Sequence, residues 1–171
     1  MRPARNSRIV VAVFGAVLSL ALAPVAGADP PAREPFVNIG GTVPAGVACA
    51  GFPVTISIDV DRQTVTTFFD KDGNPIRQTI TGRLILTVSN GTTLESRTYR
   101  LGGAIHVAFG VDGSVTLTLT GNSLISLFPN DVPPGPSTTQ GSGRAVIRID
   151  ALFTLLSRTG SVEDVCAALA P

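Results

Sequence analysis

The two cysteines of this chain, Cys49 and Cys166, are the residues whose chemistry the sequence defines best. The chain starts with a basic head, continues into an apolar stretch over 9–22, and then reads Ala26-Gly27-Ala28. This order is typical of a secretory signal peptide, so we expect residues 1–28 to be removed on export. Because exported proteins fold in an oxidising environment, a lone cysteine pair predicts an intramolecular disulfide bond between Cys49 and Cys166.

A weaker set of candidate ligands lies in the segment Asp70-Lys71-Asp72-Gly73-Asn74. Hard cations prefer clustered oxygen atoms, which makes Asp70, Asp72 and Asn74 candidate calcium ligands. The segment lacks the distant bidentate glutamate of a helical calcium loop. A hairpin turn explains the same residues and is the interpretation we favour, so we expect no metal and no other cofactor.

The only histidine, His106, is the one obvious candidate for acid–base chemistry. Its neighbours Ile105 and Val107 are apolar, so we expect His106 to point to the other face of a strand, near Thr118 and Thr120. A Ser-His-Asp site needs a serine beside the histidine, and the chain contains no Gly-x-Ser-x-Gly motif. We therefore assign no catalytic residue.

The charge balance excludes some classes of partner. Removal of the signal peptide would take three of the 13 basic residues and leave ten against 12 acidic residues. This balance does not indicate a nucleic-acid partner or an anionic membrane surface. After the signal peptide no apolar run approaches the roughly 18 residues of a transmembrane helix.

Apolar and polar residues alternate with a period of two through most of the chain after Pro53, and Val, Ile and Thr dominate. This pattern is typical of strands with one buried face. Turn-forming residues separate the runs, at Asp61-Arg62, Asp72-Gly73-Asn74, Asn90-Gly91 and Asp112-Gly113. The sequence therefore predicts an all-β fold, an antiparallel meander that closes into a small barrel, with a two-sheet sandwich as the alternative.

The alternation also predicts strand registers, because a slip of one residue would move a whole apolar set to the wrong face. A two-residue loop at Asp61-Arg62 would pair Ile58 with Val65 and Val54 with Phe69. Three-residue loops would pair Val88 with Leu94, around Asn90-Gly91-Thr92, and Val111 with Val115 and Phe109 with Leu117, around Asp112-Gly113-Ser114. The first of these loops would also set Arg83 opposite Tyr99 on the outer face.

The two ends of the chain differ from this pattern. Residues 29–48 are expected to form an N-terminal leader, and residues 49–171 a single β-domain whose final strand runs over 144–155. Ser161 is followed by an acidic turn and by Ala and Leu, which predicts a short helix over about 161–170. Cys166 would attach this helix to the segment before the first strand.

A Pro- and Gly-rich stretch over 129–143 predicts the one long loop. Loops of this length without regular structure are uncommon unless they are functional or disordered. The candidate binding residues are therefore Pro129, Asp131, Pro133, Pro134 and Pro136, and a passive connection between strands is the alternative.

The layout resembles that of small exported β-rich bacterial proteins of unknown function. The resemblance rests on the segment Ala26-Gly27-Ala28-Asp29-Pro30, on the lead-in from Gly46 to Thr55 through Cys49, and on the hairpin meander with Asp112-Gly113-Ser114. It implies a secreted protein and carries no catalytic motif.

Two functions are consistent with these features. The first is a non-enzymatic extracellular domain that binds a small apolar ligand or a protein partner. The alternative is a small secreted enzyme that uses acidic residues. The first is favoured, because no catalytic constellation is visible. A buried Asp, Arg or His that lines a cavity would be the feature that argues for chemistry inside the fold.

Overall fold

The computed structural model describes residues 30–171, which form a nine-stranded antiparallel sheet and one very short helix. The strands follow the alternation of β-branched and polar residues, which suits a pleated surface. They are β1 (Ala32–Phe36), β2 (Gly41–Val43), β3 (Val54–Phe69), β4 (Pro75–Asn90), β5 (Ser96–Phe109), β6 (Val115–Leu127), β7 (Ser137–Ile149), β8 (Phe153–Thr159) and β9 (Val162–Asp164), and the helix is α1 (Val165–Ala168).

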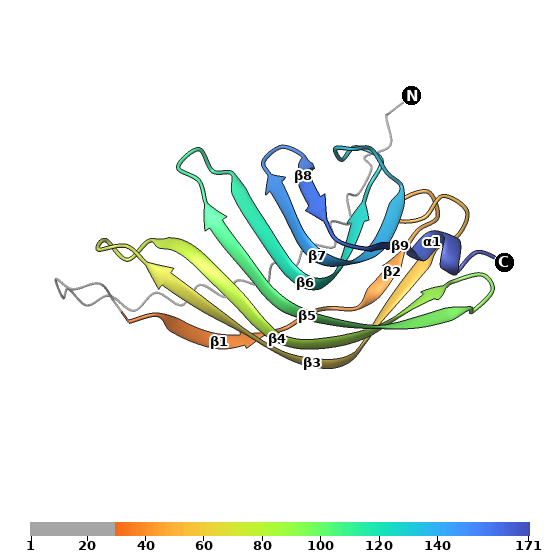
Figure 1. Cartoon of the computed structure of the whole chain (residues 1–171), viewed down its shortest axis with the longest axis horizontal. Coiled ribbons are helices and arrows are strands. Elements are labelled where there is room, and N and C mark those ends of the chain that lie inside the picture. Colours follow the sequence, from red (N-terminus) through yellow and green to blue (C-terminus); the bar gives the residue numbers. More distant parts are fainter. Residues whose placement is uncertain (1–29) are drawn as a thin grey trace, which may run out of the picture.

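The sheet is open. Its strand order is β1-β3-β4-β5-β6-β7-β8, with β2 paired to β3 and β9 paired to β7. One edge is therefore formed by β1 and β2, and the other by β8 and β9. Figure 1 shows the sheet bent into a U, with its long strands rising on both sides of the lowest part. Within residues 30–171 no pairing joins the two edges, so the predicted barrel closure is not seen.

A row of glycines crosses the sheet where the long strands bend. Gly82 pairs with Gly103, Gly121 pairs with Gly143, and Gly160 lies beside Gly143. All have φ between 83° and 129°, which side chains other than glycine rarely adopt. Because a glycine inside a strand permits a sharp bend, this row divides the strands it crosses into two arms.

Two apolar clusters lie on the sheet. The first packs α1 and the segment before β3 against β3, β4 and β5, and its most buried members include Cys49, Val54, Val88, Val165 and Leu169. The second is formed by Ile125, Leu127, Ala145 and Ile147, with half-buried residues of β6, β7 and β8 packed on it. Cys49 and Cys166 lie at disulfide distance, as predicted, with their Cα atoms 5.6 Å apart.

The predicted turn at Asp61-Arg62 is wrong, because β3 continues through it to Phe69. Ile58 pairs with Leu86 rather than Val65, and Val54 pairs with Asn90 rather than Phe69. Tight two-residue hairpin loops need residues that accept positive φ, such as Asn-Gly, and Asp-Arg does not supply them.

The predicted loop at 90–92 is too short. The Asn90 carboxamide oxygen accepts the N–H groups of Thr92 and Thr93, at 2.8 and 3.2 Å, and the Asn90 N–H donates to the Glu95 carbonyl at 2.8 Å. Val88 therefore pairs with Arg97 instead of Leu94. This change of register places Tyr99 opposite Leu86 and buries it in the first cluster, so it does not lie opposite Arg83 on the outer face.

The loop around Asp112 is also longer than predicted. The Asp112 carboxylate accepts the N–H and hydroxyl of Ser114, and the Gly110 N–H donates to the Ser114 carbonyl at 2.7 Å. Phe109 consequently pairs with Val115, and Val107 pairs with Leu117. The register differs from the prediction by two residues, so the predicted apolar face is retained.

The ends of the chain contain more strand than expected. In the segment assigned to a leader, residues 32–36 and 41–43 pair with β3. The final strand is interrupted at Asp150, whose carboxylate accepts the Leu152 N–H and forms a turn between β7 and β8. The helix begins at Val165 rather than near Ser161, because Asp164 caps it and residues 162–164 pair with β7. Of the predicted long loop, residues 137–143 belong to β7.

Candidate functional site

One face of the arm that carries the β3–β4, β5–β6 and β7–β8 hairpins is mostly apolar across the sheet, with Thr67 and Gln78 as polar members. Residues that pair directly share a face, so the registers define its rows. The rows are Val65, Ile80, Ile105, Leu119 and Ala145, then Thr67, Gln78, Val107, Leu117 and Ile147, and then Phe109, Val115, Ile149 and Phe153 near the hairpin tips.

This apolar face is the concave one. Ile125 and Leu127 belong to the opposite arm of the bent strands from Ala145 and Ile147, yet the four residues form one cluster. Side chains of two arms meet across a bend only on its inner side. Most of the face is incompletely covered: Val65, Ile105, Phe109 and Leu119 are half-buried, whereas Ile80 and Val107 are buried.

Two β-bulges place charged side chains on this concave face. In β3 the register shifts between Ile58 and Val60, and Asp61 then pairs with Leu84. In β8 the register shifts at Leu156, and Arg158 then pairs with Ala145. A bulge inserts one extra residue and so reverses the alternation of faces beyond it. Simple alternation from Phe153 and Leu155 would have put Arg158 on the outer face, so the sequence reading missed it.

Arg158 extends from β8 across the bend to β7. Its Nη1 donates to the Thr139 hydroxyl at 2.7 Å, and its Cζ and Nε lie 3.0 Å from where a Cβ on Gly141 would be. Its Nη2 is buried and has no hydrogen-bond partner. No carboxylate of the described residues forms an ion pair with it, and burial lowers the pKa of its guanidinium.

Asp61, in contrast, is fully engaged. One of its carboxylate oxygens accepts the backbone N–H and side-chain amide of Asn38, at 2.8 and 3.0 Å, and the other accepts the Gln63 N–H at 3.1 Å. The Asn38 amide also donates to the Gln63 side chain at 2.7 Å. This network attaches the segment between β1 and β2 to β3, so the Asp61 carboxylate has a structural role.

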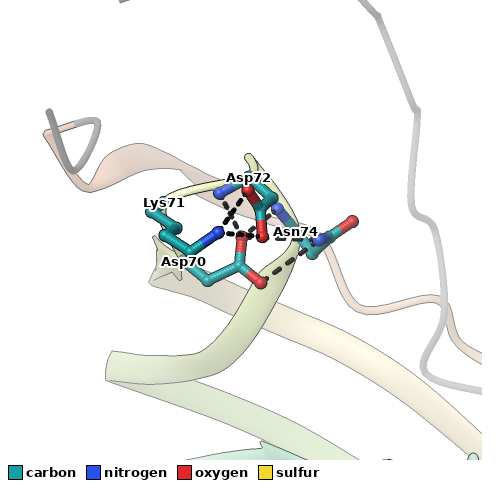
Figure 2. Close-up of polar contacts among 4 residues, drawn as sticks. All are labelled: Asp70, Lys71, Asp72 and Asn74. Atoms are coloured by element: carbon teal, nitrogen blue, oxygen red, sulfur yellow. Dashed lines mark hydrogen bonds and ion pairs between the residues drawn. The ribbon is translucent and has the colours of Figure 1, made fainter. Parts of the chain in front are cut away.

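The candidate calcium ligands form a closed hydrogen-bonded turn, shown in Figure 2. The Asp70 carboxylate accepts the backbone N–H groups of Asp72 and Asn74 at 2.8 and 2.9 Å, and also the Asn74 side-chain amide. The Asp72 carboxylate pairs with Lys71 at 2.8 Å. The hydrogen bonds from Asn74 lower the pKa of Asp70. The carboxylates therefore serve the turn and the neighbouring lysine.

His106 lies on the outer, convex face, opposite Thr118 as the sequence suggests. Its Nδ1 is 3.4 Å from the Thr79 hydroxyl, and the residue is exposed. The same face carries Phe68, which the Arg77 guanidinium covers at 4.1 Å from the ring centroid. Neither residue faces Arg158 or the apolar rows.

The loop over 129–136, which contains all five candidate binding residues, packs against β8. The Asp131 carboxylate accepts the Phe128 N–H at 2.6 Å, and Val132 exchanges backbone hydrogen bonds with Phe153 and Leu155. Pro129, Pro133 and Pro134 are exposed, whereas Pro136 is half-buried. The loop thus covers part of the free edge of β8, a common protection for an edge strand.

Within residues 30–171, no group of three or more His, Cys, Asp or Glu side chains is placed to hold a metal ion. The described part of the chain also contains no helix long and apolar enough to cross a membrane. Comparison of the chain with protein-family models, with curated proteins and with solved structures finds no match.

Proposed function

We propose that this protein is a secreted, non-enzymatic domain that binds a small apolar ligand against the concave face of its sheet. The observation that carries the proposal is the set of half-buried apolar side chains on that face, at Val65, Ile105, Phe109 and Leu119. Concave surfaces lined by apolar side chains with few polar groups are typical of small-molecule sites.

The two opposite ends of the bent sheet differ in a way that supports this function. At one end of the sheet, α1 and the Cys49–Cys166 pair lie over the first apolar cluster. The hairpin tips at the other end carry exposed apolar residues, including Ile76, Val111 and Leu152. An apolar ligand would therefore reach the concave face from the hairpin end. A protein partner at that end is the second candidate, because the same exposed tips could contact it.

The direct test is titration of the mature protein with N-phenyl-1-naphthylamine, a neutral apolar dye. We expect saturable binding that Phe109→Asn weakens about tenfold, because Phe109 contributes apolar area on the concave face. The matched control is Ala108→Asn, which changes the neighbouring exposed residue of the convex face and should bind as the unchanged protein does. Absence of dye binding, or equal loss in both variants, would contradict the proposed site.

Secretion is tested separately. The signal peptide lies outside the residues that the structure describes, so its cleavage remains a prediction. N-terminal sequencing of protein recovered from the culture medium should begin at Asp29. Recovery of the chain only inside cells, with Met1 retained, would contradict export.

A further inference from the structure

Among the described residues, Arg158 is a half-buried charged feature of the concave face that an entirely apolar ligand leaves unexplained. A guanidinium has five N–H donors, and the only hydrogen bond it makes among the described residues goes to Thr139. A half-buried cation without a carboxylate partner is unfavourable, because desolvation is not offset by an opposite charge. The local structure nevertheless accommodates this side chain. The bulge at Leu156 turns Arg158 inward, and Gly141 has no side chain to occupy the same space.

We infer that Arg158 receives the anionic head of an amphiphilic ligand whose apolar chain lies along the concave rows toward the hairpin tips. This inference rests on the proposed function and names the class of ligand. The shared chemistry is a single carboxylate or phosphate group attached to an alkyl chain. A guanidinium suits both heads, because a charged N–H group donates strongly to an oxygen of either anion.

The geometry favours an amphiphile over a protein carboxylate. Arg158 lies beside the glycine row, at the bend, where β7 passes from one arm to the other. The apolar rows begin next to it, at Ala145 and Leu119, and end near the tips at Phe109 and Phe153. A ligand with its head group at the bend and its chain toward the tips would contact Arg158 and also cover the apolar rows.

The experiment is displacement of bound N-phenyl-1-naphthylamine by three ligands with the same chain, which are dodecanoate, dodecyl phosphate and dodecanol. We expect at least one anionic ligand to compete about tenfold better than dodecanol, since one hydrogen bond to a charged group has about that effect. In Arg158→Met this advantage should disappear, while dodecanol competes as before. The difference between dodecanoate and dodecyl phosphate identifies the preferred head.

The matched control is Arg144→Met, because Arg144 is an exposed arginine of β7 that pairs with Thr120 on the convex face. It should retain the preference for anionic heads. If circular dichroism shows that Arg158→Met does not fold, Arg158→Gln removes the same positive charge and keeps a polar side chain.

The outcomes separate the two proposals. If dodecanol competes as well as both anions, or if the anionic preference survives loss of the Arg158 charge, the assignment of Arg158 is wrong and the apolar site stands. If the dye does not bind at all, the proposed function itself fails.

Discussion

At the scale of single residues, buried amides and exposed carboxylates hold this fold at its turns. Asn90 is the clearest case, because it is 1% exposed and uses both ends of its side chain. Its carboxamide oxygen accepts two loop N–H groups, and its Nδ2 donates to the Leu169 carbonyl just after α1 at 2.9 Å. One side chain thus fixes the β4–β5 loop and the C-terminus together.

We predict that Asn90→Ala lowers the free energy of unfolding by about 2–3 kcal/mol, because it leaves buried polar groups without partners. The control is Thr92→Ala, which removes an exposed side chain from the same Asn-Gly-Thr segment and should change stability by less than about 0.5 kcal/mol. Urea unfolding measures both. Equal stability of the two variants would show that the Asn90 bonds contribute nothing.

Asp70 offers a prediction about pH. Its pKa lies below the ordinary value of 3.8, chiefly because the backbone N–H and then the side-chain amide of Asn74 donate to it. A lowered folded pKa means that the turn is most stable with Asp70 ionised, above the unfolded pKa, and loses that stabilisation as the pH falls through the folded pKa. Asn74→Ala keeps the backbone donor and should raise the Asp70 pKa partway toward 3.8, as followed by carboxyl NMR. A remote change, Asn122→Ala, should leave it where it is.

At the scale of the elements, the row of glycines determines the shape of the sheet. A Cβ on Gly103 would overlap the Thr120 carbonyl, and the residue has φ 127°. We predict that Gly103→Ala destabilises the protein by about 2–4 kcal/mol, through backbone strain and steric overlap. Gly41→Ala is the matched control, because nothing lies within 4 Å of its Cβ position. Thermal unfolding distinguishes them, and similar midpoints would mean that the bend tolerates side chains.

The sequence predicts the strands and their buried faces better than it predicts the loop lengths and registers. The alternation correctly indicated an antiparallel all-β fold and the apolar face of β5 and β6, because burial of one strand face is a period-two property. The registers were wrong where side chains close the loops, at Asn90 and Asp112, because hydrogen bonds of single residues decide loop length there.

The site was harder to predict than the fold. Arg158 and Asp61 reach the concave face through β-bulges. The extra residues of these bulges are Leu156 and Asp59, and neither residue type signals a bulge in the sequence. The glycine row did carry a signal. Gly82, Gly103, Gly121 and Gly143 stand inside strands rather than at turns, which is an unfavourable place for glycine unless the backbone must bend.

At the scale of the whole molecule, the two edges of the sheet are connected by side chains and a covalent bond rather than by a strand ladder. Cys49 lies in the connection between β2 and β3, at one edge, and Cys166 lies in α1, which follows β9 at the other. The Thr138 hydroxyl of β7 also donates to the Ala48 carbonyl at 3.1 Å. The end of the sheet near α1 is therefore fastened.

This arrangement predicts how the protein loosens when the bond between Cys49 and Cys166 is lost. Their separation of 117 residues makes the loss worth on the order of 4–5 kcal/mol in the loop-closure description. In a variant with both cysteines changed to alanine, hydrogen exchange should accelerate first at Val165 and Leu169, which the bond holds against the first cluster. Amides of Ile125 and Ile147 belong to the second cluster and should keep their protection until global unfolding. If both clusters lose protection equally, the bond stabilises the sheet as a single unit and does not fasten one end of it.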